Sequence, residues 1–199
     1  MELIQENPEL DAYLAADEAI DHQHPYVTET ARRLGAETSD AYTYAEAAFT
    51  FVRDTIWHSV DSGDLRVSWR ASDVLATRNG ICHAKSHALA ALLRAAGIPA
   101  ALCYQRLVND DGNRSMLHGL VALRLPGRER WARVDARGNT PGVDARFSLD
   151  HERLAWPVRT ASGEADYPVL YAAPRPEVLG ALRRARDRHE LWEMLPGAL

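Results

Sequence analysis

In the first part of the chain the hydrophobic residues between Ala41 and about His58 recur near the spacing of a helix. Three other stretches are also predicted to be helical, namely the Ala-rich stretch Asp11–Ile20, Tyr26–Leu34 and Ser72–Thr77. Ser39 and Asp40 precede the stretch that begins at Ala41 and Ser72 opens the last one, and both residue types are favoured helix caps. Gly35 follows the stretch Tyr26–Leu34, where glycine commonly ends a helix. We therefore expect this part of the chain to be helical.

The stretch from Cys82 to Ala96 is apolar on nearly every side. An amphipathic surface helix would keep a polar face, so this pattern is typical of a helix buried in a core. Gly97 follows as a helix stop, and Pro99 prevents the helix from continuing.

After this helix the pattern changes to that of β-strands. The predicted strands are Ala100–Val108, Leu117–Leu125, Trp131–Asp135 and Tyr167–Tyr171, with a hairpin turn at Asp110–Asn113 between the first two. Pro174 or Pro176 opens a last helix that runs to about Met194. Helices that precede a consecutive antiparallel meander indicate an α+β fold.

Composition narrows the class of protein. The chain has 199 residues, of which 46% are hydrophobic and 26% charged, as in an ordinary globular domain. The net charge of −5 argues against a nucleic-acid-binding surface, and no stretch is long and apolar enough for a membrane span. Two cysteines, Cys82 and Cys103, exclude a disulfide scaffold. With no signal-peptide pattern at the N-terminus, we expect a cytoplasmic protein.

Three residues carry the clearest chemistry. Cys82 stands at the start of the buried helix, where the helix dipole and unpaired amides favour a thiolate. His118 begins one predicted strand and Asp135 ends the next. Since the two strands are antiparallel neighbours, His118 and Asp135 can meet, which suggests a Cys–His–Asp triad. A structural cysteine buried as a small hydrophobe is the alternative.

Several stretches of the chain resemble the core of the transglutaminase-like superfamily. They are Trp69–Leu75, Arg78–Cys82, Leu92–Ala100, Met116–Gly119 and Trp131–Asp135. The resemblance is strong between Trp69 and Asn139 and loose elsewhere. It implies the papain-like α+β fold, with N-terminal helices, a nucleophile helix packed on an antiparallel sheet, and a C-terminal helix. It also implies that Cys82 is the nucleophile, His118 the base and Asp135 the residue that orients the base.

The resemblance implies one domain over residues 1–199, with a helical part at 1–68, a catalytic core at 69–139 and a C-terminal part at 140–199. The chain is far shorter than the calcium-dependent animal transglutaminases, and it has no acidic loop with calcium-ligand spacing. Protein crosslinking and calcium activation are therefore not expected, and no cofactor is implied.

Other residues have weaker claims on function. Trp69 is a candidate for the acyl pocket or for an oxyanion donor, with a core tryptophan as the alternative, and Gln105 points either to the site or to solvent. Lys85, the only lysine, lies one turn from Cys82 and either supports the thiolate or is structural. His83 and His87 are spaced so that they could bind a metal together with Cys82, but the favoured interpretation is that they only flank the active-site helix.

The sequence therefore predicts a cysteine-dependent hydrolase or acyltransferase that attacks an amide or ester carbonyl and passes through a thioester. The expected substrate is a peptide, a protein or a small amide. Two alternatives stay open, namely a catalytically silent binding module of the same fold, and a metal-binding protein that uses Cys82, His83 and His87.

Overall fold

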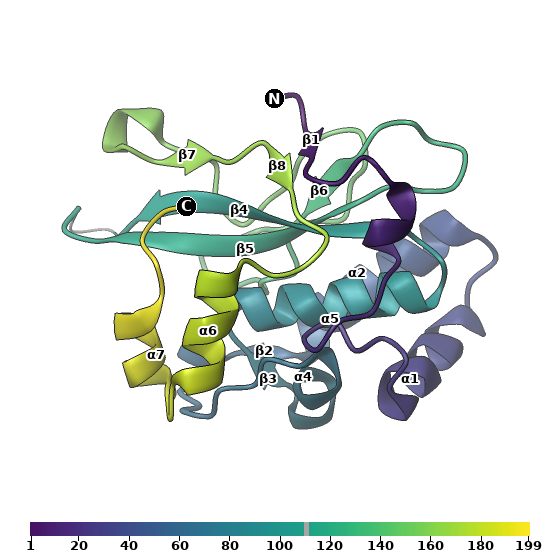
Figure 1. Ribbon diagram of the computed structural model, residues 1–199, viewed down its shortest axis with the longest axis horizontal. Helices are drawn as coiled ribbons and strands as arrows, with labels where there is room; N and C mark the ends of the chain where they lie inside the picture. The colour runs from purple at the N-terminus through teal and green to yellow at the C-terminus, as the bar shows by residue number, and fades with distance from the viewer. Residues whose placement is uncertain (110–111) are drawn as a thin grey trace.

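The computed structural model describes residues 1–109 and 112–199. Its α-helices are α1 (Pro25–Gly35), α2 (Ala41–Thr55), α3 (Ser59–Ser62), α4 (Ala71–Thr77), α5 (Cys82–Ala95), α6 (Pro176–Arg184) and α7 (Arg188–Met194). Its strands are β1 (Ile4–Gln5), β2 (Trp57–His58), β3 (Asn79–Gly80), β4 (Ala100–Val108), β5 (Ser115–Leu123), β6 (Ala132–Val134), β7 (Ala165–Asp166) and β8 (Val169–Leu170). Two short 3₁₀ helices lie at Leu10–Tyr13 and Thr160–Ser162. The predicted α+β class is confirmed (Figure 1).

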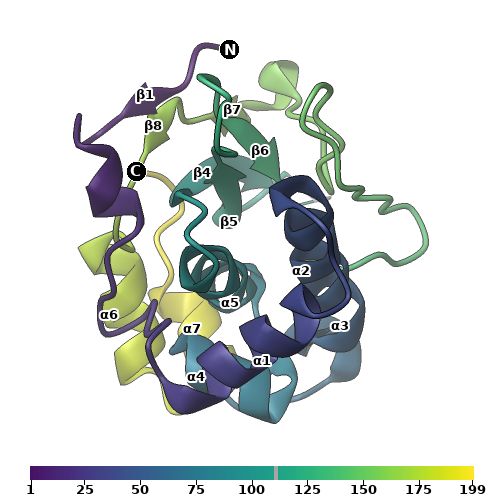
Figure 2. The same cartoon turned by 90° about the vertical axis from the view of Figure 1, so that its right-hand side faces the viewer.

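Helix α5 lies at the centre of the molecule. Viewed along its axis, it is surrounded by the other helices on one side and by the sheet on the other (Figure 2). Every residue from His83 to Arg94 is buried. This burial explains the apolar pattern of the sequence, because a helix with neighbours on all sides has no face left for polar side chains.

The main sheet has the strand order β6-β5-β4-β7, with antiparallel neighbours throughout. Strands β4 and β5 pair along their whole length, with Gln105 opposite His118. Leu102 and Tyr104 point to the core around α5, whereas Cys103 packs in a second cluster on the other face. The predicted turn between these strands includes Asp110 and Asp111, which lie outside the described residues.

Strand β6 is much shorter than its neighbour β5. It pairs only with Val121–Leu123, so the first part of β5 has no strand beside it on that edge. The backbone groups of this open edge are available to other partners, and α5 begins next to them.

Two short parallel pairs join segments that are far apart in the sequence. Strand β1 pairs with β8, and β2 pairs with β3. In the second pair His58 stands opposite Gly80, two residues before Cys82. This contact brings the end of the helical region next to the start of α5.

Helix starts agree with the sequence at α2 but not at α4. Asp40 caps α2 and forms a reciprocal capping box with Thr43. The expected cap of α4, Ser72, lies inside the helix instead, where its amide and hydroxyl both donate to the carboxylate of Asp21. The carboxylate of Asp21, which is distant in the sequence, thus provides the hydrogen bond at the start of α4 that the Ser72 side chain was expected to provide.

Three predicted helices need correction. The helix expected from Ala41 to about His58 ends at Thr55, because Trp57 and His58 pair with β3 instead. The stretch Asp11–Ile20 forms only a 3₁₀ turn, because the Asp17 carboxylate accepts hydrogen bonds from the amides of Ala19 and Ile20 and holds a turn there. The last helix is divided into α6 and α7, and Asp187 caps the second of them. The predicted strand at 167–171 is present as β7 and β8, which flank Tyr167 and Pro168.

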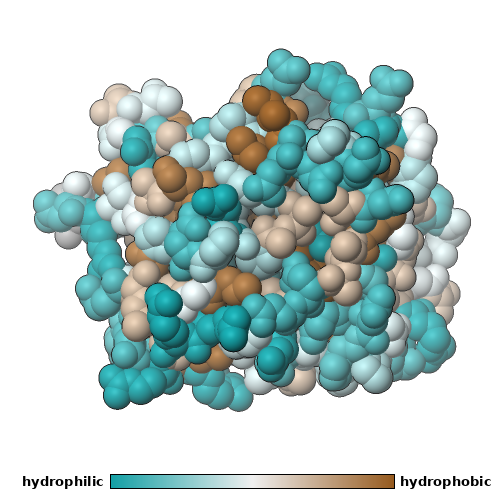
Figure 3. Space-filling model, viewed as in Figure 1, coloured by the Kyte–Doolittle hydropathy of each residue, from teal (hydrophilic) through white to brown (hydrophobic). Residues whose placement is uncertain are grey.

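The surface seen in Figure 3 is largely hydrophilic, with hydrophobic residues scattered between polar ones. Within the described part of the chain, no helix has the length and apolar character needed to cross a membrane.

Candidate active site

Cys82 is the first residue of α5 and is partly exposed. The preceding residue, Ile81, provides no side-chain cap, so the amides of the first helical turn are not satisfied by a capping group. These amides and the helix dipole favour a negative charge at the thiol.

The start of α5 is hydrogen-bonded to the open edge of β5. The Nε2–H of His83 donates to the carbonyl oxygen of Leu117 at 3.0 Å, and the thiol of Cys82 is within hydrogen-bonding reach of the Gly119 amide. Gly119 allows this approach, because a Cβ at that position would lie 2.5 Å from Nδ1 of His83. The residues on either side of His118 thereby hold the residues at the start of α5.

His118 lies between Cys82 and Asp135. Its Nε2 is 2.8 Å from a carboxylate oxygen of Asp135, and the Cys82 thiol is close enough to His118 that each group shifts the pKa of the other. Asp135 directly follows β6, and its carboxylate also accepts hydrogen bonds from the amides of Arg137 and Ala155, at 3.1 and 3.0 Å. The structure thus brings the three predicted residues together, with His118 between the thiol and the carboxylate.

Electrostatics favour charged forms of all three side chains. Burial raises the pKa of the Cys82 thiol, but His118 and the Gly119 amide outweigh it and lower this pKa overall. Burial disfavours the imidazolium of His118, yet Asp135 and Cys82 raise the His118 pKa to about 10. The pKa of Asp135 is lowered because its hydrogen bonds and the His118 charge outweigh burial. A thiolate–imidazolium pair at neutral pH follows.

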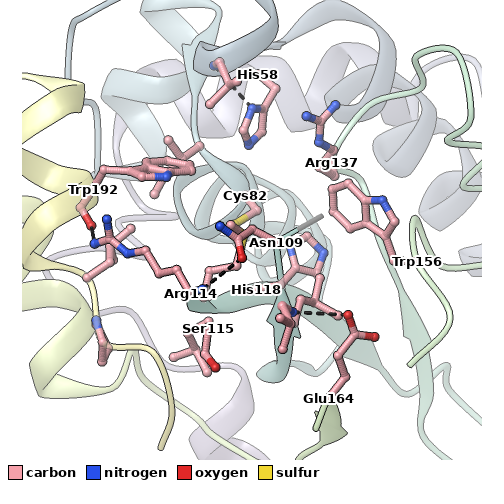
Figure 4. Close-up of a pocket in the computed structure, with 18 of the residues that line it drawn as sticks. His58, Cys82, Asn109, Arg114, Ser115, His118, Arg137, Trp156, Glu164 and Trp192 are labelled. Carbon is pink, nitrogen blue, oxygen red and sulfur yellow. Dashed lines mark hydrogen bonds between the residues drawn. The ribbon is translucent and has the colours of Figure 1, made fainter. Parts of the chain in front are cut away.

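The thiol opens into a pocket of about 530 Å³ (Figure 4). Its apolar walls come from α5, the β4–β5 hairpin, a loop near residue 156 and the C-terminal segment. The apolar lining residues are Val60, Ile81, Leu107, Val108, Met116, Leu117, Trp156, Pro157, Trp192, Leu195 and Pro196. Substrate can therefore reach Cys82 through a mostly apolar space.

The arginines that line this pocket are all paired with acids. Arg137 forms a two-pronged ion pair with Asp61, Arg159 pairs with Glu164, and Arg114 pairs with Glu193. Each positive charge is thus balanced by a nearby negative one.

Sequence analysis missed two lining residues close to the triad, Trp156 and His58. The ring of Trp156 packs edge-on against His118 with centroids 5.1 Å apart, and the Arg137 guanidinium lies over the same indole. His58 is buried at the end of β2 and its ring faces the pocket (Figure 4). No motif or spacing marks either residue, because both reach the site through long-range contacts.

The structure brings neither Trp69 nor Gln105 into the pocket. The carbonyl of Trp69 bonds to His87, and the guanidinium of Arg70 stacks on its ring, 4.4 Å from the centroid. Gln105 is buried beside His118 across the strands, but its amide donates to Asp166 at 2.9 Å. A role in substrate contact is therefore not supported for either residue.

His83 and His87 serve different carbonyl groups. His83 bonds to Leu117 and His87 to Trp69, so neither shares a ligand position with Cys82. Among residues 1–109 and 112–199, no group of three or more histidine, cysteine or acidic side chains is arranged to hold a metal ion.

Lys85 and Cys103 are structural. The ammonium group of Lys85 is buried and donates to the Arg53 and Ile56 carbonyls at the end of α2, where a positive charge complements the helix dipole. Burial lowers the Lys85 pKa to about 7. Cys103 is fully buried, and burial raises the pKa of its thiol.

Comparison with known families finds a match. The model of the transglutaminase-like superfamily matches residues 28–136, a span that contains Cys82, His118 and Asp135. No curated protein matches the chain.

One solved structure shows the same fold, and a second matches with a lower TM-score. A candidate cysteine protease from Cytophaga hutchinsonii matches 66% of this chain with a TM-score of 0.54 and 19% identity. The periplasmic domain of TgpA from Pseudomonas aeruginosa matches 62% of the chain with a TM-score of 0.46 and 24% identity. The matches cover 43% and 45% of those two chains, so the shared part is less than half of each.

Proposed function

Because the chain belongs to the transglutaminase-like superfamily, we propose that it is a cysteine-dependent enzyme that cleaves an amide or ester through a thioester on Cys82. The observation that carries this proposal is the line of side chains from Cys82 through His118 to Asp135, in which His118 is hydrogen-bonded to Asp135 and Cys82 lines a pocket. Each neighbour in this line supplies what a thiol nucleophile needs, namely a base and a group that orients the base.

Acylation begins with attack of the Cys82 thiolate on the substrate carbonyl carbon. A C–S bond forms, and the electron pair of the carbonyl moves to its oxygen. When the tetrahedral intermediate collapses, the carbonyl is restored and the bond to the leaving group breaks. The His118 imidazolium gives its proton to the departing nitrogen or oxygen, and Asp135 holds the ring in place for this transfer.

Deacylation reverses the roles. His118, now neutral, takes a proton from water as the water oxygen attacks the thioester carbonyl. The C–S bond breaks, the acid leaves, and the thiolate–imidazolium pair is restored. We assign water as the acceptor because Cys82 is partly exposed and the single lysine of the chain is buried away from the pocket.

The pocket also favours one class of acyl group. Its walls are mainly apolar, and its three arginines are balanced by Asp61, Glu164 and Glu193. A charged acyl group would lose its hydration on entering the pocket. Because the arginines are already paired, it would find no unpaired charge there to compensate, so its binding would be unfavourable. We therefore propose peptides, proteins or small amides with a neutral, apolar acyl side chain as substrates.

Mass spectrometry of the intact protein tests the proposal. After exposure to p-nitrophenyl acetate we expect a transient acetyl adduct on Cys82, which then decays as acetate is released. A Cys82→Ser variant should form no such adduct, whereas Cys103→Ser should behave like wild type. A protein that binds peptides but never forms the adduct would be a binding module of this fold.

A further inference from the structure

A tetrahedral intermediate at Cys82 places a negative charge on the former carbonyl oxygen, and this charge needs hydrogen-bond donors. The backbone amide of Cys82 is one donor within the pocket, because it opens α5 and Ile81 gives the helix no side-chain cap. One amide alone leaves the oxygen with a single partner, so a second fixed donor in the pocket is needed.

His58 is held so that one edge of its ring carries a hydrogen-bond donor. Its Nδ1 accepts a hydrogen bond from the Val60 amide at 3.4 Å, where His58 caps the short helix α3. A neutral imidazole that accepts at Nδ1 carries its proton on Nε2. This Nε2–H has no hydrogen-bond partner among the described residues, and His58 lines the same pocket as Cys82.

The surroundings keep this imidazole neutral. Burial and the nearby cations of Arg137 and Lys85, together with His118 and His83, lower the pKa of His58 well below its usual value. A neutral donor does not compete with the Cys82 thiolate for the proton of His118, so it can act without disturbing the ion pair.

The backbone places His58 beside the nucleophile. Strand β2 pairs with β3 so that His58 lies opposite Gly80, and the chain turns into α5 two residues later. In the close-up view one edge of the His58 ring is turned toward Cys82 (Figure 4). Its Nδ1, on another edge of the ring, accepts the hydrogen bond from the Val60 amide. His58 is 6% exposed. Its strand β2 pairs with β3, the strand that directly precedes the start of α5.

We infer that the Nε2–H of His58 and the backbone N–H of Cys82 form the oxyanion hole of this enzyme. The inference rests on the proposed acyl chemistry of Cys82. As the thiolate attacks, the electron pair that leaves the carbonyl bond collects on oxygen, and the two N–H groups donate to it without giving up their protons. When the intermediate collapses, the pair returns to the carbonyl bond and both donors are released.

The test compares two substitutions of similar size. His58→Gln keeps an N–H donor on a flexible side chain, and His58→Met fills the space without any donor. Two rates are measured for each: acylation of Cys82 by p-nitrophenyl acetate, which creates an oxyanion, and alkylation by iodoacetamide, which does not. Rates are expressed per alkylatable Cys82, so a poorly folded fraction is not counted.

We expect His58→Met to slow acylation by about 100- to 1,000-fold while alkylation is unchanged, because one oxyanion donor is worth about that much. His58→Gln should recover a large part of the loss. The control is His87→Gln, which removes another buried histidine that lies outside the pocket and should change neither rate.

Three results would overturn the inference: acylation of His58→Met at the wild-type rate, equal acylation of the two His58 variants, or a parallel fall of acylation and alkylation. A wild-type protein whose Cys82 is neither alkylated nor acylated would instead contradict the proposed function itself.

Discussion

His83 donates a hydrogen bond to the carbonyl of Leu117, so the sequence neighbours of Cys82 and His118 are bonded to each other at 3.0 Å. This bond explains how a helix start and a strand keep their reactive side chains in register. Gly119 continues the contact, because its lack of a side chain lets the ring of His83 lie against the strand.

Substitution of Gly119 by alanine tests this docking. The new Cβ would lie 2.5 Å from His83 Nδ1 and 3.2 Å from its Cα, so the helix and the strand must separate. We expect a loss of about 1–3 kcal/mol in the free energy of unfolding and slower alkylation of Cys82, measured by denaturant titration and mass spectrometry. Gly142→Ala, in a loop with open space around it, is the control for alkylation, although its φ of +89° also costs some stability. A Gly119→Ala protein with wild-type alkylation would show that this contact does not align the site.

Thiol labelling tests the ion pair. In the folded protein, iodoacetamide should modify Cys82 far faster than Cys103. The pKa of the Cys82 thiol is lowered, whereas burial raises the pKa of the Cys103 thiol. Labelling of Cys82 should persist at pH 6, where an ordinary thiol with a pKa of about 8.5 is almost fully protonated. His118→Ala should abolish the labelling at pH 6. Preferential labelling of Cys103 would contradict the assignment of the nucleophile.

The carboxylate of Asp135 supports the charge on His118. Asp135→Asn removes that charge, so the His118 pKa should fall and the pH midpoint for Cys82 alkylation should rise. We also expect turnover of p-nitrophenyl acetate to fall on the order of 100-fold, as is typical when acid–base catalysis is impaired. Asp166→Asn is the matched control, since Asp166 bonds to Gln105 and Arg133 and not to His118. Equal effects of the two substitutions would argue for a purely structural role of Asp135.

Stability should fall on acidification between pH 7 and pH 5. Burial lowers the pKa of His83 to about 3 and also lowers the pKa of His58 and His87. Below the unfolded pKa of about 6.5, the unfolded chain binds protons that these three folded histidines do not, so each contributes a loss of up to about 1.4 kcal/mol per pH unit. His118, with a folded pKa of about 10, opposes this loss until its unfolded imidazole is also protonated, and it adds no slope once the pH is well below 6.5.

Urea denaturation at pH 7, 6 and 5 measures this slope. His87→Gln should flatten it, because that substitution removes one of the three titrating rings without touching the pocket. Constant or increasing stability over this range would mean that the buried histidines accept protons in the folded state.

The fate of the thioester separates a hydrolase from a transferase. With a labelled primary amine present at millimolar concentration, we expect release of acid and little incorporation of the amine. Self-crosslinking should be absent under either mechanism, since Lys85 is the only lysine and its ammonium group is buried against the end of α2. Efficient amine incorporation with little acid released would identify an acyltransferase while leaving Cys82 as the nucleophile.

Local patterns were sufficient for much of the fold and for the central residues of the candidate site. The apolar pattern after Cys82 predicted the buried helix, and the strand-like pattern after Pro99 predicted β4 to the residue and β5 to within two residues at each end. The proximity of His118 and Asp135 also followed from the sequence, because antiparallel neighbours place the start of one strand beside the end of the next.

The failures occur where a distant group replaces a local one. Asp21 satisfies the start of α4 that Ser72 was expected to cap, and the Asp17 side chain turns the chain where a run of alanines favoured a helix. Gln105 lies beside His118, as its strand position suggests, yet Asp166 binds its amide outside the pocket. Propensity describes single segments, and tertiary hydrogen bonds worth about 1 kcal/mol each are enough to override it.

The sequence by itself determined which residue begins the central helix, which strands follow it, and that a thiol, an imidazole and a carboxylate can meet. The spacing of hydrophobic residues in a helix or a strand is a local property, so a single sequence is enough to recognise it. Only the tertiary structure decided that His58 and Trp156 face the thiol and that Trp69 does not. Those positions depend on the β2–β3 pair and on loops packed against the sheet, and the register of such contacts leaves no periodic trace in the sequence.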